Sequence, residues 1–207
     1  MLQHERQAWS EGFAALAGID EAGRGPLAGP VIAAAVSIPR ERLEDPRFRE
    51  LDGLQDSKKL SPARREYFFR ILTADPSIAW AVGRADVEEI DRLDILRATH
   101  LAMRRAVDHL PRKADLLLVD GLPVPGLPVD SRSIVDGDAQ SLLIAAASII
   151  AKVTRDLEMI EWDRQFPQYG FARHKGYGTA AHLAALARHG PSPIHRRSFA
   201  PVKRVSL

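Results

Sequence analysis

The chain has 207 residues, 45% of them hydrophobic, which suffices for one substantial core and indicates a single domain. It contains no cysteine, which excludes disulfide frameworks and thiolate metal sites and favours a cytoplasmic location. The longest apolar run, residues 142–151, is about half of what a bilayer span requires, and residues 1–10 are too polar for a signal peptide. We therefore expect a monomeric protein without membrane contact.

Charge is distributed unevenly along the chain. Residues 1–163 carry 21 Lys and Arg against 27 Asp and Glu, whereas residues 164–207 carry eight Lys and Arg, four His and no acid. A basic segment of this kind suits a polyanion such as nucleic acid. It equally suits a basic tail that covers an acidic body, and composition does not separate the two interpretations.

The first half of the chain predicts strands and a helix in alternation. Residues 12–21 and 29–38 are apolar runs joined by a segment rich in glycine and proline, which predicts two paired antiparallel strands. Residues 39–60 resemble a charged loop. Ser61 followed by Pro62 predicts a helix that extends to about residue 75. A third strand is expected at residues 79–85.

The second half continues the alternation. Asp86 and Glu89 form a capping-box pattern that opens an amphipathic helix, and Thr179 and Gly190 suit the cap and the stop of a later helix. In chain order the patterns predict a helix at 86–110, a buried strand at 115–121, another strand at 132–138, and helices at 142–160 and 179–188. Helices interleaved with strands indicate an α/β domain with a mixed sheet.

Four acids stand at or near the ends of predicted strands: Asp20, Glu21, Asp120 and Asp138. Carboxylates beside an apolar core need cations. Ligand sets made only of oxygen favour Mg²⁺ or Mn²⁺ over zinc. Clustered acids that hold two such ions are one standard arrangement for hydrolysing a phosphodiester.

Each acid also has a structural explanation. Asp120 with Gly121 suits a turn at a strand end, Asp138 suits the N-cap of the following helix, and Glu21 suits an ion pair with Arg24. Taken one at a time, these explanations are the more common ones for surface acids. The joint placement of the four acids at strand ends favours a metal site instead.

Three glycine-rich or basic loops suit contact with a sugar–phosphate backbone. The Gly23-Arg24-Gly25 loop follows directly on two of the acids. Residues 56–59 include Lys58 and Lys59, and residues 173–179 include Lys175 and place Tyr177 between two glycines as a stacking platform. Solvated surface loops are the alternative explanation for all three.

Together these motifs resemble bacterial ribonuclease HII. They occur in that family's order and cover the chain from Gly18 to about Val202: GIDEAGRGPLAGPV at 18–31, DSKKL at 56–60, VDG at 119–121, AAASIIAKVTRD at 145–156 and HKGYGT at 174–179. The resemblance implies a ribonuclease H-like fold, with a five-stranded mixed sheet flanked by helices. It further implies that residues 164–207 form a helical C-terminal extension that helps to hold the duplex.

The resemblance also implies an activity and a site. It implies an endonuclease that hydrolyses the RNA strand of RNA·DNA hybrids and incises duplex DNA 5′ to embedded ribonucleotides, leaving 3′-hydroxyl and 5′-phosphate ends. Asp20, Glu21, Asp120 and Asp138 occupy the metal-binding positions. Gly23, Arg24 and Gly25 would meet the ribonucleotide, and Tyr177 would stack on the neighbouring sugar. The basic composition of the other two loops, independently of the resemblance, suggests that Lys58, Lys59 and Lys175 contact phosphates.

The chain departs from the family pattern at one position, because Asp136 stands where bacterial members commonly have lysine before Gly-Asp. The departure leaves two acids as candidates for one ligand, and the motif position after Gly137 favours Asp138. Two other functions fit the same residues. One is a carboxylate-dependent nuclease or phosphatase with another substrate, and the other is a non-catalytic hybrid-binding protein.

Overall fold

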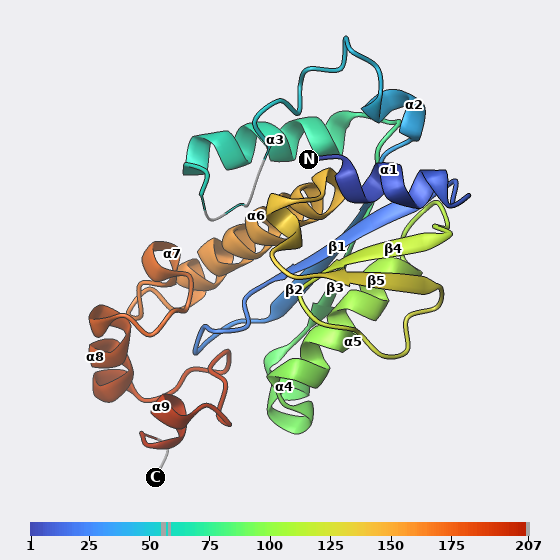
Figure 1. Ribbon diagram of the computed structural model, residues 1–207. Helices are drawn as coiled ribbons and strands as arrows, with labels where there is room; N and C mark the ends of the chain where they lie inside the picture. The colour runs from blue at the N-terminus through green and yellow to red at the C-terminus, as the bar shows by residue number, and fades with distance from the viewer. Residues whose placement is uncertain (55–56, 58, 206–207) are drawn as a thin grey trace.

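The computed structural model describes residues 1–54, 57 and 59–205. Its centre is a five-stranded mixed sheet in the order β3-β2-β1-β4-β5 (Figure 1). The strands are β1 (Leu16–Ala22), β2 (Val31–Ser37), β3 (Ala79–Ala85), β4 (Leu116–Asp120) and β5 (Asp130–Ile134). The predicted α/β architecture, a mixed five-stranded sheet flanked by helices, is confirmed.

The sheet brings two of the predicted acids to one edge. β1 pairs antiparallel with β2 and parallel with β4, with Ile19 opposite Val119. The next residue along each strand is an acid, Asp20 on β1 and Asp120 on β4. Because parallel strands end at the same side of a sheet, both carboxylates lie at the carboxyl edge of the central strand pair.

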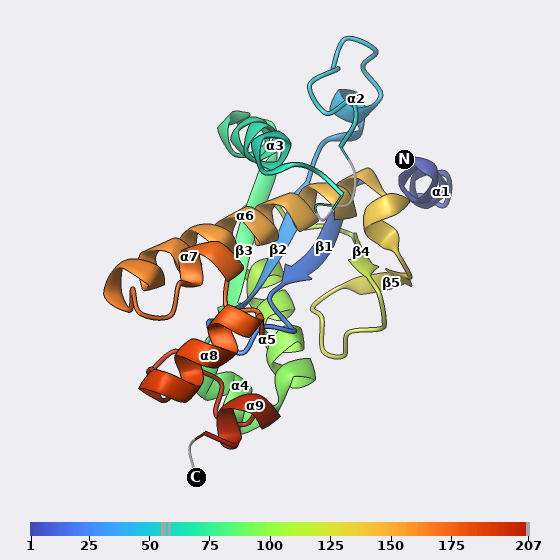
Figure 2. The ribbon, with the colours of Figure 1, turned by 90° about the vertical axis from the view of Figure 1, so that its left-hand side faces the viewer.

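Helices cover both faces of the sheet (Figure 2). On one face α6 packs against β1 and β2, and α3 packs against α6. On the other face α5 packs against β2 and β3. Successive strand residues alternate between the two cores, so that Leu118 faces α6 and Val119 faces α5. The helices are α1 (Gln3–Ser10), α2 (Arg40–Leu43), α3 (Pro62–Ala74), α4 (Val87–Leu93), α5 (Ile95–Asp108), α6 (Leu142–Gln165), α7 (Phe171–His174), α8 (Ala180–His189) and α9 (Ala200–Lys203).

Helix α6 lies so close to β1 that glycine is required at the crossing point. A Cβ atom at Gly18 would lie 2.1 Å from the carbonyl carbon of Leu143. Gly18→Ala is therefore expected to lower the free energy of unfolding by more than about 3 kcal/mol, because the obstacle is backbone. Gly12→Ala, which meets no atom within 4 Å but has a φ of +101°, should cost only about 1 kcal/mol. Urea denaturation of the two variants compares these costs, and equal losses would contradict the close-packing argument.

The structure differs from the expected elements in three places. The helix predicted over 86–110 is broken at Asp94, which adopts a φ of 78° and caps α5 by accepting a hydrogen bond from the Arg97 amide. The strand predicted at 132–138 lies earlier, at Asp130–Ile134, so that Asp138 stands in a 3₁₀ turn (Gly137–Ala139) rather than on a strand. Helix α1 was not predicted. Its Glu5 is buried and accepts hydrogen bonds from the Ser141 hydroxyl and the Leu143 amide at the start of α6.

The acid-free residues after α6 form α7, α8 and α9 and contribute to two small separate clusters, the second of which contains Val202 of α9. The first cluster contains Met159 from α6 together with Tyr169, Phe171 and Ile194. The expected cap and stop of α8, Thr179 and Gly190, are confirmed. In the part of the chain that the structure describes, no helix is both long and apolar enough to cross a bilayer.

Candidate active site

The acid at the centre of the sheet edge, Asp20, is buried, with 4% of its surface exposed. Burial raises its pKa well above the usual range, and the neighbouring carboxylates of Glu21 and Asp120 raise it further. Hydrogen bonding with Ser148 and with the Glu21 amide opposes the increase in pKa. The raised pKa of Asp20 is thus explained by three carboxylates that lie close together in a region with little solvent.

Backbone amides and one arginine contact these acids. The Glu21 amide donates to Asp20 Oδ1 at 2.6 Å, and the Gly137 amide donates to Asp120 Oδ1 at 2.7 Å. The second bond places the turn that carries Asp138 against Asp120. Arg24 Nη1 lies 3.3 Å from Glu21 Oε1, so the ion pair considered from the sequence is present.

The structure contradicts the N-cap explanation of Asp138. The N-cap of α6 is Ser141, whose side chain accepts a hydrogen bond from the Ile144 amide. Asp138 instead lies buried in the 3₁₀ turn, whereas Asp136 is exposed and has a left-handed φ of 53°. Of the two acids in the motif, Asp138 is therefore the one held at the sheet edge.

The chemistry of these donors fits a divalent cation, although their present arrangement is not a closed coordination shell. Among the described residues, no three His, Asp or Glu side chains are gathered closely enough to hold an ion between them. Three carboxylates interact at the edge, and their repulsion is one that a hard cation would relieve. Oxygen is the only ligand atom that the four predicted acids offer, which suits Mg²⁺ or Mn²⁺.

A cleft of about 520 Å³ opens beside the acids. The predicted substrate-binding residues Gly23, Arg24, Gly25 and Tyr177 line it together with Glu21. A Cβ atom at Gly25 would lie 3.8 Å from Cε1 of Tyr177, so the ring lies directly beside the loop. The structure therefore brings together two motifs that are separated by about 150 residues in the sequence.

The predicted lysines do not share this arrangement. Lys58 lies outside the described residues. Lys59 is exposed and is not among the described residues that line the cleft. Lys175 has a φ of 52°, and its amine contacts the Ala172 carbonyl rather than the cleft.

Five polar residues that line the cleft were given no role in the sequence analysis: Ser57, Arg65, Ser148, Lys152 and Arg155. Arg65 Nη1 donates to the carbonyls of Ser57 and Leu60, at 2.8 and 2.5 Å, and Ser148 Oγ lies 2.8 Å from Ser57 Oγ. These contacts fix Ser57 and Leu60 of the DSKKL motif against α3 and α6. The spacing of Ser148, Lys152 and Arg155 along α6 was an available signal, since residues three and four apart share one helix face.

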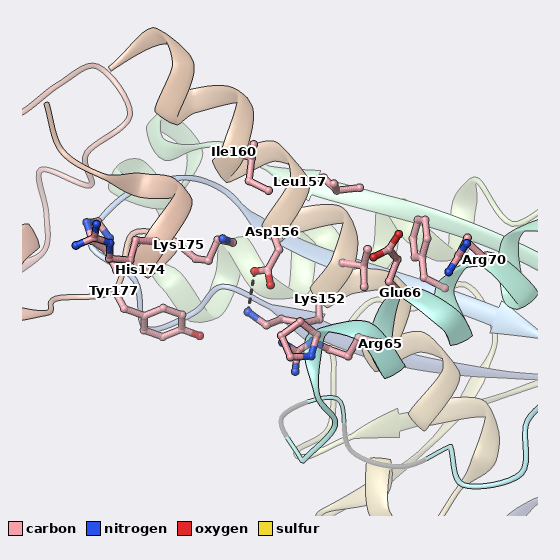
Figure 3. Close-up of a pocket in the computed structure, with 14 residues that line it drawn as sticks. Arg65, Glu66, Arg70, Lys152, Asp156, Leu157, Ile160, His174, Lys175 and Tyr177 are labelled. Atoms are coloured by element: carbon pink, nitrogen blue, oxygen red, sulfur yellow. Dashed lines mark hydrogen bonds and ion pairs between the residues drawn. The ribbon is translucent and has the colours of Figure 1, made fainter. Parts of the chain in front are cut away.

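A second groove, of about 680 Å³, continues from the cleft between α3 and α6 (Figure 3). Arg65, Lys152 and Tyr177 line both spaces. The groove has an apolar side that includes Phe69 and Leu157. Lys152 is held within it by an ion pair with Asp156 at 2.7 Å.

A chain of buried histidines supports the loop that carries Tyr177. The Ser192 amide donates to His195 Nδ1 at 3.0 Å, and His195 Nε2 lies 3.0 Å from His182 Nε2. His182 Nδ1 lies 2.9 Å from the Tyr177 carbonyl. These contacts assign the tautomers, because each ring must accept at one nitrogen and donate at the other. Both rings are therefore neutral in this arrangement.

Because these buried histidines are neutral, we expect the free energy of unfolding to decrease in acid. Burial lowers the pKa of His195 from 6.5 to about 4, with a further contribution from His182. Between these values the unfolded chain binds a proton that the folded chain does not. This contribution is therefore complete above pH 6.5, and up to about 3 kcal/mol is lost as the pH falls towards 4.

Melting temperatures measured between pH 7.5 and 4.5 test this expectation. His195→Gln should flatten the profile across that window. His109→Gln, at an exposed histidine, is the matched control and should leave the profile unchanged. An equally steep profile for His195→Gln and the unaltered protein would contradict the assignment.

The arrangement places acidic residues at the carboxyl edge of a ribonuclease H-like sheet, beside a cleft with basic and glycine-rich walls. This fold is shared with solved structures. The ribonuclease H2 from Pyrococcus horikoshii OT3 is 28% identical and superposes with a TM-score of 0.77, covering 92% of this chain and 96% of that one. Fold and cleft define a nuclease of the ribonuclease H class.

The family is shown by sequence comparison. The model of the family "Ribonuclease HII" matches residues 17–202. A ribonuclease HII from Coxiella burnetii is 54% identical over 192 residues, which is 93% of this chain and 91% of that protein. One from Desulfitobacterium hafniense is 53% identical over 204 residues, which is 99% of this chain and 75% of that protein. The chain belongs to the ribonuclease HII family, whose members are divalent-metal-dependent endoribonucleases that cleave RNA in RNA·DNA hybrids.

Proposed function

We propose that this enzyme also incises duplex DNA 5′ to a single embedded ribonucleotide, and that it leaves 3′-hydroxyl and 5′-phosphate ends. One observation carries the proposal, namely that the Gly23-Arg24-Gly25 loop and the Tyr177 ring lie side by side in the cleft that Glu21 lines. A glycine-flanked loop permits close approach to a 2′-hydroxyl, and a flat ring can stack on the adjacent sugar. A single ribonucleotide offers one 2′-hydroxyl, which one such loop suffices to read.

The same proposal assigns Asp20, Glu21, Asp120 and Asp138 as the ligands of the divalent metal, two ions being expected during catalysis. The bound cations supply an activated water and stabilise the leaving oxygen. The acids of the chain hold the ions in a region where Asp20 is shielded from solvent. Asp138 is favoured over Asp136 because its turn is tied to Asp120 through the Gly137 amide.

The other residues of the cleft position the substrate. Arg24 and Lys152 place positive charge on its walls, where a phosphate of the cleaved strand would lie. Tyr177 orients the neighbouring sugar, and because it lies next to Gly25 it limits how far the strand can shift along the cleft. Binding and orientation thus come from residues that do not contact the metal.

Residues 164–207 are proposed to form the extension that holds the duplex outside the cleft. Arg173, Arg188, Arg197, Lys203 and Arg204 are exposed there and can meet phosphates. Arg196 is fully buried and cannot. The proposal includes a monomeric enzyme located in the cytoplasm.

Cleavage-site mapping tests the proposed function. The substrate is a DNA duplex with one ribonucleotide, incubated with Mg²⁺, with Mn²⁺ and with excess chelator. We expect a single cut 5′ to the ribonucleotide, a 3′-hydroxyl and a 5′-phosphate at the ends, and reversible loss of cleavage in chelator. Cleavage of a hybrid with a long RNA strand but not of this duplex would overturn the proposal.

A further inference from the structure

Two arginines are buried in the fold without a carboxylate partner. Arg155 on α6 is 1% exposed and Arg196 is 0% exposed, and neither forms an ion pair within the described residues. Burial lowers the pKa of Arg196 to about 9 and lowers that of Arg155. Burying a charge is costly unless hydrogen bonds compensate it, so these guanidinium groups call for an explanation.

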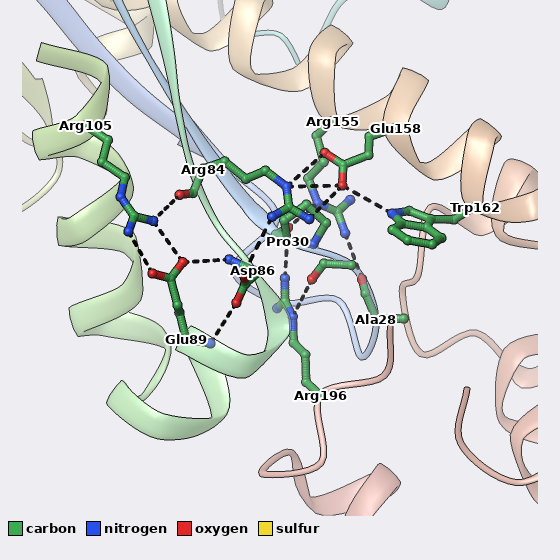
Figure 4. Close-up of polar contacts among 11 residues, drawn as sticks. Ala28, Pro30, Arg84, Asp86, Glu89, Arg105, Arg155, Glu158, Trp162 and Arg196 are labelled. Atoms are coloured by element: carbon green, nitrogen blue, oxygen red, sulfur yellow. Dashed lines mark hydrogen bonds and ion pairs between the residues drawn. The ribbon is translucent and has the colours of Figure 1, made fainter. Parts of the chain in front are cut away.

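Both guanidinium groups bind backbone carbonyls of one loop, residues 23–30 (Figure 4). Arg196 donates to the carbonyls of Gly23, Arg24, Pro26, Gly29 and Pro30 at 2.5 to 3.1 Å. Arg155 donates to Ala28, Pro30 and Lys175 at 3.0 Å each. The two side chains share the Pro30 carbonyl. Five N–H donors on each planar fork can satisfy such a set, which no other side chain can do.

The bonds from Arg196 determine which way the peptides of the loop face. In a trans peptide the carbonyl and the following N–H point in opposite directions, and no cis peptide occurs in the described residues. Because Arg196 draws the Gly23 and Arg24 carbonyls towards itself, the amides of Arg24 and Gly25 point away from it. Pro26 shows the same relation, since its carbonyl accepts from Arg196 while the Leu27 amide donates to the Gly176 carbonyl at 2.8 Å.

The two outward amides are available for a ligand. Arg24 and Gly25 line the cleft, and neither amide donates a hydrogen bond to another described residue. The loop packs closely against Arg155, because a Cβ atom at Gly23 would lie 2.1 Å from Arg155 Nε. The loop is thus clamped from within and presents two donors on its outer side.

We infer that Arg196, supported by Arg155, is a positioning residue that aims the amides of Arg24 and Gly25 at the ribonucleotide. The inference rests on the proposed function, since it concerns the same cleft. Two buried like charges are a poor means of stabilising a core, because apolar side chains of similar volume serve at least as well. Holding seven carbonyls of two loops in one orientation is a task that apolar side chains cannot perform.

Arg196→Lys tests the inference, because lysine keeps the charge and loses the fork. Two quantities are measured for the variant and for the unaltered protein, one on the ligand-free enzyme and one during cleavage. The first is the ¹⁵N chemical shift and order parameter of Arg24 and Gly25 without metal or substrate. The second is the ratio of kcat/KM on a duplex with one ribonucleotide to kcat/KM on an RNA·DNA hybrid. We expect the order parameters to fall from about 0.85 to below about 0.6, and the ratio to fall at least fivefold.

Arg112→Lys is the matched control, since Arg112 also donates to carbonyls, those of Ser77 and Pro76 at the opposite end of the sheet. It should change neither readout. Arg155→Lys disrupts the hydrogen bonds to the Ala28 and Pro30 carbonyls of the loop and to the Lys175 carbonyl, and it replaces Arg196→Lys if that variant fails to fold.

The inference would be overturned if the ¹⁵N shifts and order parameters of Arg24 and Gly25, and the ratio of the two kcat/KM values, were the same in the variant and the unaltered protein. It would also be overturned if kcat/KM fell by the same factor on both substrates and in proportion to a lower melting temperature, because Arg196 would then have a purely structural role. If the unaltered enzyme does not cut at a lone ribonucleotide while the amides still move, the proposed function fails and the orienting role of Arg196 stands.

Discussion

Asp20→Asn is expected to abolish cleavage while raising the melting temperature. Asp20 is buried beside Glu21 and Asp120; burial raises its pKa most, and both neighbouring carboxylates raise it further. Replacing its charge with an amide of the same size removes this repulsion, and about 2 to 4 °C is expected for each kcal/mol that is relieved. The same change removes a proposed metal ligand, which is worth several kcal/mol, or about a thousandfold in rate.

The two effects separate catalysis from folding. Single-turnover cleavage at saturating Mg²⁺ and thermal denaturation without metal are measured on the same preparation. Asp108→Asn, at an exposed acid on α5, is the matched control and should change neither quantity. Activity within tenfold of the unaltered enzyme would show that Asp20 does not hold the metal. A lower melting temperature would show that its charge is compensated within the fold.

Tyr177→Ala is expected to lower kcat/KM on a single-ribonucleotide duplex by about ten- to a hundredfold. Tyr177 is 45% exposed, and its ring lies beside Gly25, where it can stack on a sugar. A stacking contact is worth roughly 1 to 3 kcal/mol when it is realised in the transition state. Tyr177→Phe should retain most of the activity, since the hydroxyl makes no hydrogen bond to another described residue.

Binding to the same duplex without metal should change less than the rate, because phosphate contacts dominate affinity. Tyr67→Ala is the matched control, since Tyr67 is 40% exposed on α3 and does not line the cleft. It should leave kcat/KM unchanged. Equal rates for Tyr177→Ala and the unaltered enzyme would reduce the ring to a structural part of its loop.

The sequence predicted the features that depend on local pattern. Alternating and continuous apolar runs located β1, β2, β3 and β4, and the placement of Asp20 and Asp120 at strand ends put them at one sheet edge. β5 was placed four residues late at its far end because it is mostly exposed and polar, so that burial imposes no pattern on it. Asp94 ended one helix and began another because a local cap outweighs a continuing apolar period.

Features that depend on backbone carbonyls could not be predicted in this way. Arg196 counts as one of the cations in a basic tail when only side chains are considered. Arg196 is buried because it binds the backbone carbonyls of residues 23–30. Every residue has a backbone carbonyl, so no sequence pattern shows which carbonyls the fold brings together. The metal-binding roles of Asp20, Glu21, Asp120 and Asp138 stay predictions, since they rest on the proposed binding of metal.

Helix α6 runs through every part of the site. Ser148 bonds with Asp20, Lys152 lines the cleft, Arg155 holds the loop of residues 23–30, and Met159 enters the small core beside Gly176. These positions span about 16 Å along one rigid rod. The helix therefore fixes the distance between the acids at the cleaved bond and the loop that contacts the sugar. One inserted residue between Ser148 and Lys152 would rotate the two ends by about 100° and should move or abolish the cut, even in a protein that still folds.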